Sequence, residues 1–120
     1  MIAAVQLRAP DGADQAEFHE QAAVALRALA GRPGFRGGTL GRATDDARAW
    51  LLLTEWESVG AYRRALGSYQ VKLSTPVLGQ ALDQPSAFEA LLEIDAAGTE
   101  RESASDRAAD ADWAPRHPNG

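Results

Sequence analysis

The run Arg48–Trp56 constrains the fold most, because it predicts a strand that is apolar on both faces. Side chains alternate between the two faces of a strand. One face would carry Trp50, Leu52, Thr54 and Trp56, and the other would carry Leu51 and Leu53. An antiparallel sheet covered on one side only would show a polar second face. We therefore expect a second copy of the chain to cover that face in a two-fold homodimer, with sheet packed on sheet. The competing interpretation is a wholly different fold.

The other predicted elements flank this strand in a defined order. Alternation predicts strands at Ile2–Arg8 and Phe35–Ala43, and the glycines of the second strand favour a bulge or a close backbone approach. A capping box and an apolar stripe predict an amphipathic helix over about residues 15–30. A second helix follows Ser58, a short one spans Thr75–Leu82, and a last strand spans Ser86–Ile94. This βαββαβ order predicts a ferredoxin-like α+β fold with a four-stranded antiparallel sheet.

The composition changes after Ile94, which places the end of the domain there. The last predicted strand carries Phe88, Ala90, Leu92 and Ile94 on one face. Residues 95–120 have no hydrophobic period and contain one large apolar residue, Trp113. We expect a domain over residues 1–94 and an acidic, flexible tail over residues 95–120. The alternative is an arm that docks Trp113 on a partner subunit or over a pocket.

Composition excludes several classes of function. The chain has no cysteine and only two histidines, which argues against metal sites of ordinary composition. Its net charge of −5 argues against a nucleic-acid partner. It contains no apolar run near the ~20 residues that span a bilayer and no signal-type leader, so no membrane partner and a cytoplasmic location are expected. By elimination, we expect a small aromatic ligand and no nucleotide cofactor.

The strongest candidates for binding such a ligand are aromatic. Trp50, Thr54 and Trp56 share a strand face, and Tyr62 approaches from the helix that follows. Together they would form an aromatic-walled pocket with a phenol as its polar handle. The alternative interpretation is ordinary core packing.

Weaker candidates are polar or lie outside this strand. His19, at the flank of the first helix, is the natural candidate for a catalytic base because its ordinary pKa lies near neutrality. Gln6 offers an amide on the first strand, and Lys72 offers a cation for an anionic substrate. Tyr69 is a further substrate-binding candidate. For each of them a solvated surface position is the alternative.

Three motifs in sequence carry a resemblance to a known family. Arg32–Phe35 follows the first helix, Asp45 and Asp46 form a hairpin loop, and Thr54–Ser58 runs into Ala61–Arg63. In this order they resemble the antibiotic biosynthesis monooxygenase superfamily of dimeric α/β-barrel proteins, of the type common in actinobacteria. The resemblance covers about residues 1–94. It implies a face-to-face dimer and cofactor-free oxidation of polyketide anthrones or quinols by O₂, with Trp56 and Tyr62 at the positions of pocket residues.

The resemblance also has departures. The haem-degrading branch has a helical Trp and a His ligand where this chain has Ala65 and Thr75, so haem is not expected and no cofactor is implied. The anthrone-oxidising branch has an Asn and an Arg where this chain has Leu52 and Pro76. Three functions therefore remain open: a cofactor-independent monooxygenase, a polyketide cyclase or isomerase using the same pocket, and a non-catalytic small-molecule-binding or stress-response protein.

Overall fold

The computed structural model describes residues 1–73 and 75–103 of the chain and divides them into two compact units. The first unit spans Met1–Phe88, and the second begins at Glu89. The alternative that docks Trp113 lies outside the described residues. Among the helices of the described residues, none is long and apolar enough to span a membrane.

A four-stranded antiparallel sheet organises the first unit. Its strands are β1 (Ile2–Arg8), β2 (Phe35–Arg42), β3 (Ala49–Trp56) and β4 (Ala87–Phe88), in the spatial order β2-β3-β1-β4. The register pairs Val5 with Leu52 and Leu40 with Leu52, so β3 is central. The prediction of a ferredoxin-like α+β fold with this sheet is confirmed.

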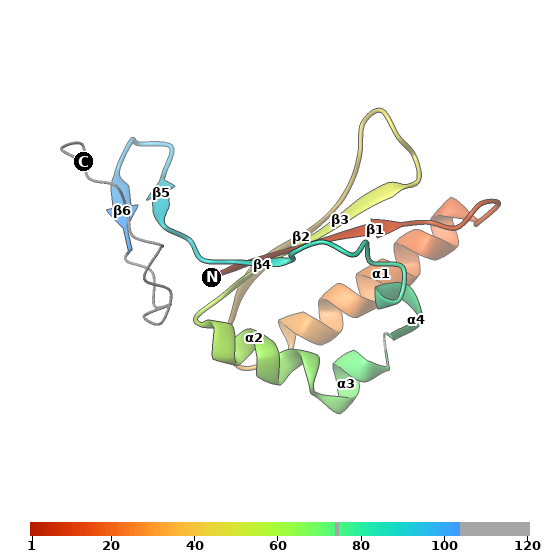
Figure 1. Ribbon diagram of the computed structural model, residues 1–120, viewed down its shortest axis with the longest axis horizontal. Coiled ribbons are helices and arrows are strands. Elements are labelled where there is room, and N and C mark those ends of the chain that lie inside the picture. Colours follow the sequence, from red (N-terminus) through yellow and green to blue (C-terminus); the bar gives the residue numbers. More distant parts are fainter. Residues whose placement is uncertain (74, 104–120) are drawn as a thin grey trace. The chain divides into compact units, whose positions relative to one another are not determined.

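The helices lie on one side of the sheet (Figure 1). They are α1 (Gln15–Ala30), α2 (Val59–Leu66), α3 (Tyr69–Lys72) and α4 (Thr75–Leu78). The predicted caps are confirmed, because Asp14 Oδ1 accepts from the Glu17 N–H at 3.0 Å and Ser58 Oγ accepts from the Ala61 N–H at 3.1 Å. The last helix ends at Leu78, four residues before the predicted Leu82, so that part of the prediction is wrong.

The core fills the space between sheet and helices, and the alternation along β3 decides which side chains enter it. Trp50, Leu52, Thr54 and Trp56 are all buried on the helix side. Phe18, Ala22, Ala25 and Leu29 meet them from the apolar stripe of α1. The predicted bulge is confirmed between Phe35 and Gly37, and a side chain at Gly38 would come within 2.8 Å of Leu26.

The opposite side of the sheet, here called the open face, remains partly apolar. It carries Ile2, Ala4, Gln6, Leu51, Leu53 and Phe88. Phe88 is 46% exposed, and Leu51 and Leu53 are half-buried. The two-sided apolar character read from β3 is therefore present in the folded chain.

The predicted last strand, Ser86–Ile94, is wrong as a single element. Only Ala87–Phe88 pairs with β1. In the second unit, β5 (Leu92–Ile94) pairs antiparallel with β6 (Glu100–Glu102), and the boundary expected at residues 94 and 95 falls inside this hairpin. The hairpin closes on Gly98, whose φ of 83° favours glycine, and the Asp95 carboxylate accepts from the N–H groups of Ala97 and Thr99.

Candidate functional site

Trp56 is the centre of a buried aromatic cluster at the end of β3. Its ring centroid lies 5.3 Å from that of Phe35, edge-on, and 5.6 Å from that of Tyr62. The indole N–H donates to Thr54 Oγ1 at 2.8 Å, a contact that alternation along the strand makes available. Trp56 itself is 0% exposed. The structure thus brings Trp56, Thr54 and Tyr62 together.

Tyr62 supplies the polar group of this cluster. The Ser58 cap starts α2, and Tyr62 lies one turn later with only 5% of its surface exposed. Burial raises the pKa of its phenol above the ordinary 10.0, and a hydrogen bond from Ser86 opposes that rise. The phenol is therefore protonated at neutral pH, so it can donate a hydrogen bond to an anionic oxygen.

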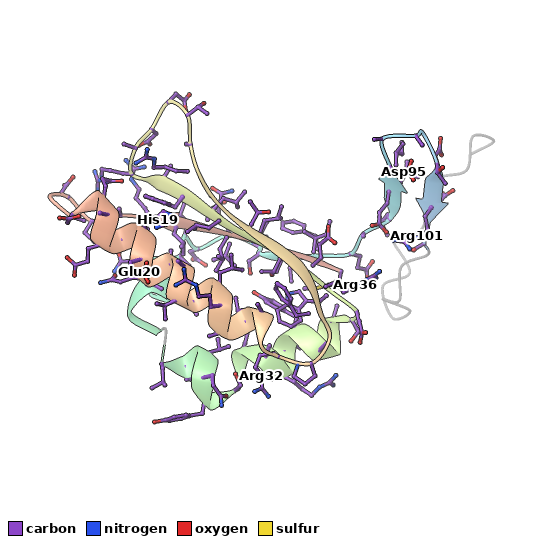
Figure 2. The ribbon with its side chains drawn as sticks, turned by 180° about the vertical axis from the view of Figure 1, so that it is seen from behind. His19, Glu20, Arg32, Arg36, Asp95 and Arg101 are labelled. Carbon is purple, nitrogen blue, oxygen red and sulfur yellow. The ribbon has the colours of Figure 1, made fainter. Side chains whose placement is uncertain are left out.

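Trp50 forms a second cluster at the other end of β3. Its ring lies 5.4 Å from Phe18 and 5.9 Å, edge-on, from His19, and the Arg42 guanidinium sits 5.4 Å from the ring centroid. His19 is exposed on α1 (Figure 2). Six residues of extended strand separate Trp50 from Trp56, which places their backbones about 20 Å apart. His19 therefore lies beside Trp50 and away from the Tyr62 phenol.

The remaining candidates from the sequence lie outside both clusters. Gln6 is exposed on the open face of the sheet. Tyr69 is 72% exposed and Lys72 is exposed, both on the short helix α3, which packs through Val71. The structure does not bring these three side chains to Trp56.

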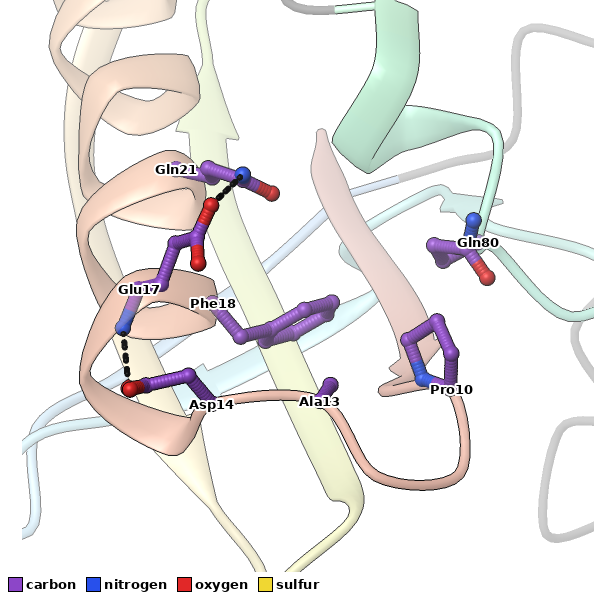
Figure 3. Close-up of a pocket in the computed structure, with 7 residues that line it drawn as sticks. All are labelled: Pro10, Ala13, Asp14, Glu17, Phe18, Gln21 and Gln80. Carbon is purple, nitrogen blue, oxygen red and sulfur yellow. Dashed lines mark hydrogen bonds between the residues drawn. The ribbon is translucent and has the colours of Figure 1, made fainter.

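Two of the hollows that the described residues line have neither Trp56 nor Tyr62 in their lining. One, of about 220 Å³, has Glu17 and Gln21 of α1 on one side, Gln80 on the other, and Phe18 and Pro10 as apolar walls (Figure 3). The other, of about 330 Å³, is on the open face and includes Gln6, Gly41 and Leu51 in its lining. Within the described part of the chain, no three His, Cys, Asp or Glu side chains gather as a metal site.

Some neighbours of these clusters were not predicted from the sequence. Phe35 meets Trp56 because the register of β2 and β3 pairs them, a contact that the spacing of single residues does not reveal. Ser86 reaches Tyr62 because its segment runs beside β1, where the Ser86 carbonyl accepts from the Ala4 N–H. Arg42 pairs in register with Trp50 and stacks on it. Each of these contacts depends on strand pairing.

Comparison with known proteins adds a family and a set of similar folds. Residues 1–73 match the family described as antibiotic biosynthesis monooxygenase. SnoaB from Streptomyces nogalater, described as a cofactor-independent oxygenase, is 28% identical with a TM-score of 0.57, over 67% of this chain and 81% of SnoaB. A putative antibiotic biosynthesis monooxygenase from Deinococcus radiodurans is 18% identical with a TM-score of 0.66, over 78% of this chain and 95% of its own. No curated protein matches the chain.

Proposed function

The chain belongs to the antibiotic biosynthesis monooxygenase family, and on that premise we propose that it is a cofactor-independent monooxygenase. Its substrate is a small aromatic, anthrone- or quinol-like metabolite of the kind made in polyketide biosynthesis. The observation that carries the proposal is the buried Trp56–Tyr62 pair, which lies inside the matched residues. The likeness to SnoaB, described as a cofactor-independent oxygenase, supports the same reaction class.

The reaction balances without an added reductant. An anthrone methylene loses two hydrogens and gains one oxygen atom from O₂, and the second oxygen atom leaves with those hydrogens as water. The substrate therefore supplies all the electrons. The protein has to stabilise the anion formed when the substrate loses a proton and keep water away from it.

Trp56 and Tyr62 have the properties that this task requires. The neutral Tyr62 phenol donates a hydrogen bond to the substrate oxyanion, where a low-dielectric setting strengthens the interaction. The Trp56 indole is 0% exposed, so an aromatic substrate stacks on it after one of its neighbours moves aside. Because Ser86 donates to the Tyr62 oxygen, the phenol hydrogen remains available for the substrate oxygen.

Oxygen uptake with a panel of anthrones and quinols tests the proposal. Tyr62→Phe removes only the donor and should lower kcat by about a hundredfold, the usual effect of losing one oxyanion donor. Trp56→Phe should also lower the rate. Tyr69→Phe makes the same chemical change at a 72% exposed side chain and should leave uptake unchanged. An absence of uptake across the panel, or a fully active Tyr62→Phe variant, would refute the proposal, and product formed without O₂ would identify a cyclase or isomerase instead.

A second candidate function is a non-catalytic small-molecule-binding protein. The complete enclosure of Trp56 favours it, because Phe35, Thr54 and Tyr62 surround the indole as core residues would. The two candidates differ in what the Tyr62→Phe variant loses. If the cluster is only core, Tyr62→Phe changes the free energy of unfolding and no ligand or activity depends on the hydroxyl.

The proposal includes a homodimer formed through the open face. Ile2, Leu53 and Phe88 form a contiguous apolar surface there. Ile2 of β1 pairs with Phe88 of β4, and Ala4, two residues after Ile2, pairs with Leu53 of β3. Exposed apolar surface of this kind is a common mark of an interface. Packing one copy of this face against a second removes it from water.

A further inference from the structure

The hollow on the open face is a depression that small residues make at one corner of the sheet. Gly41, Ala43 and Ala49 lie in its lining, and their side chains have one carbon or none. Leu51 and Gln6 border them on β3 and β1, in register with Gly41. The hollow has a volume of about 330 Å³, and a Cβ atom at Gly41 would meet nothing within 4 Å. It therefore has room for a large apolar side chain.

A projecting ring lies at the opposite corner of the same face. Phe88 of β4 is 46% exposed, whereas the other large apolar side chains of the open face are half-buried. Phe88 pairs with Ile2, and Ile2 lies four residues before Gln6 on β1, which is about 13 Å along the strand. Across the strands, β4 is one edge of the sheet and β2, which carries Gly41, is the other. The ring and the hollow are therefore diagonally opposed on one surface.

We propose that the Phe88 ring of each copy packs into the open-face hollow of the other. This contact rests on the homodimer that is part of the proposed function, and it fixes how the two sheets meet. Two-fold symmetry forms the contact twice, because a residue that meets a second one is met by it in return. An axis that lies between the sheets, perpendicular to the line from Phe88 to the hollow, exchanges the two corners. The strands of the two sheets then cross at a steep angle.

Truncation of the ring tests the strength of the contact. An aromatic side chain seated in a pocket of the partner is the usual form of an interface hot spot. Because each dimer contains the contact twice, Phe88→Ala should weaken self-association in sedimentation by about a hundredfold or more. Val24→Ala is the control, since Val24 is 49% exposed on α1, away from the open face, and its truncation should leave self-association unchanged. A dimer of unchanged strength in Phe88→Ala would overturn the proposal.

A double variant tests whether ring and hollow meet. Gly41→Leu occupies the hollow and should weaken self-association, because Phe88 of the partner subunit no longer fits. Combined with Phe88→Ala it should cost little more than either single variant, since the leucine fills the space that the ring has left. Gly37→Leu is the control, because Gly37 lies on the same face of β2, outside the hollow, and its Cβ would also meet nothing within 4 Å. Its effect should add to that of Phe88→Ala, and an additive loss at Gly41 would contradict the contact.

Cross-linking locates the contact directly, because the natural chain contains no cysteine. Phe88→Cys and Gly41→Cys chains, purified separately and then mixed, should be joined by a bismaleimide with an ethylene arm. Each mixed dimer has one cysteine on either side of one contact. Phe88→Cys mixed with Gly37→Cys should give no product, since Gly37 lies four residues, or about 13 Å, before Gly41 on β2.

The other products identify the other ways of packing the sheets. A link to Gly37→Cys but not to Gly41→Cys would mean that the two-fold axis runs along the strands, and the proposal is then wrong. Phe88→Cys chains that link to each other would place the two rings together at the axis, which is equally contrary to it. A monomeric wild type in sedimentation would remove the dimer and this contact together. Oxygen uptake is a separate measurement, and Tyr62→Phe should leave the Phe88–Gly41 link unchanged, so the oxidation and the contact fail independently.

Discussion

Gly34 is the position where the fold tolerates a side chain least, and it holds the helix that carries Tyr62. It follows α1 with a φ of 87°, in the left-handed region that favours glycine. A Cβ atom there would lie 2.5 Å from the Cβ of the buried Ala61 on α2. The Gly34 carbonyl also accepts from the Glu57 N–H at 2.9 Å, just before α2 begins. Gly34→Ala should therefore destabilise the domain and displace α2.

The magnitude follows from two separate costs. An alanine in the left-handed region costs about 1–2 kcal/mol. Forcing one extra methyl group into a packed contact costs about 1–3 kcal/mol more. The sum, about 2–5 kcal/mol, is a large fraction of the ~5–15 kcal/mol that typically stabilises a domain. Urea unfolding should show a lower midpoint with an unchanged slope.

Two further variants separate these costs. Gly12 has a similar φ of 74°, but a Cβ atom there would meet nothing within 4 Å. Gly12→Ala should therefore lose only the stability that an alanine costs in the left-handed region. The double variant Gly34→Ala with Ala61→Gly removes the contact between the two Cβ atoms. It should recover the stability lost to that contact, apart from about 1 kcal/mol for a glycine inside a helix. A Gly34→Ala variant within about 0.5 kcal/mol of the wild type, or equal losses at positions 12 and 34, would refute the reasoning.

Three further predictions concern the interface and two titrating groups. Leu53→Asp places a charge on the open face and should produce a monomer in sedimentation without loss of helical signal; a dimer of unchanged strength would remove the interface assignment. The hydrogen bond from Arg8 holds the pKa of Asp46 below its ordinary 3.8, so its stabilising contribution is complete above that value and is lost as the pH falls through the lowered pKa. Asp46→Asn should accordingly lower stability at neutral pH but not in strong acid, as measured by urea unfolding at a series of pH values. Ser86→Ala removes the bond that opposes the raised pKa of Tyr62, so ultraviolet titration should show that pKa rising further.

The elements predicted correctly are those whose causes are local. The N-caps at Asp14 and Ser58 depend on contacts three residues apart, so the sequence displays them directly. The two apolar faces of β3 follow from alternation alone. The order of these elements along the chain is compatible with few topologies. The ferredoxin-like sheet is one of them, and it buries the side chains of β3 that face the helices.

The prediction of a single last strand over Ser86–Ile94 was wrong because periodicity does not encode pairing partners. Phe88, Leu92 and Ile94 alternate as one strand would, yet Phe88 pairs with Ile2 whereas Leu92 pairs with Glu102. Nothing local distinguishes a strand that continues along β1 from one that leaves it to form a hairpin. The Asp95 turn and Gly98 supply the second alternative, and their hydrogen bonds fix it.

The same limit applies to the candidate site, with a consequence for its chemistry. The sequence offered Trp56 and Tyr62 as residues of an aromatic pocket and His19, on the first helix, as the candidate base. The length of β3 instead places the backbones of Trp50, which lies beside His19, and Trp56, which lies beside Tyr62, about 20 Å apart. We therefore expect that a substrate held by Tyr62 does not give its proton to His19. If His19→Gln leaves oxygen uptake unchanged while Tyr62→Phe abolishes it, the chemistry belongs to the Trp56 end of the strand; the reverse result would require the substrate to bind beside Trp50.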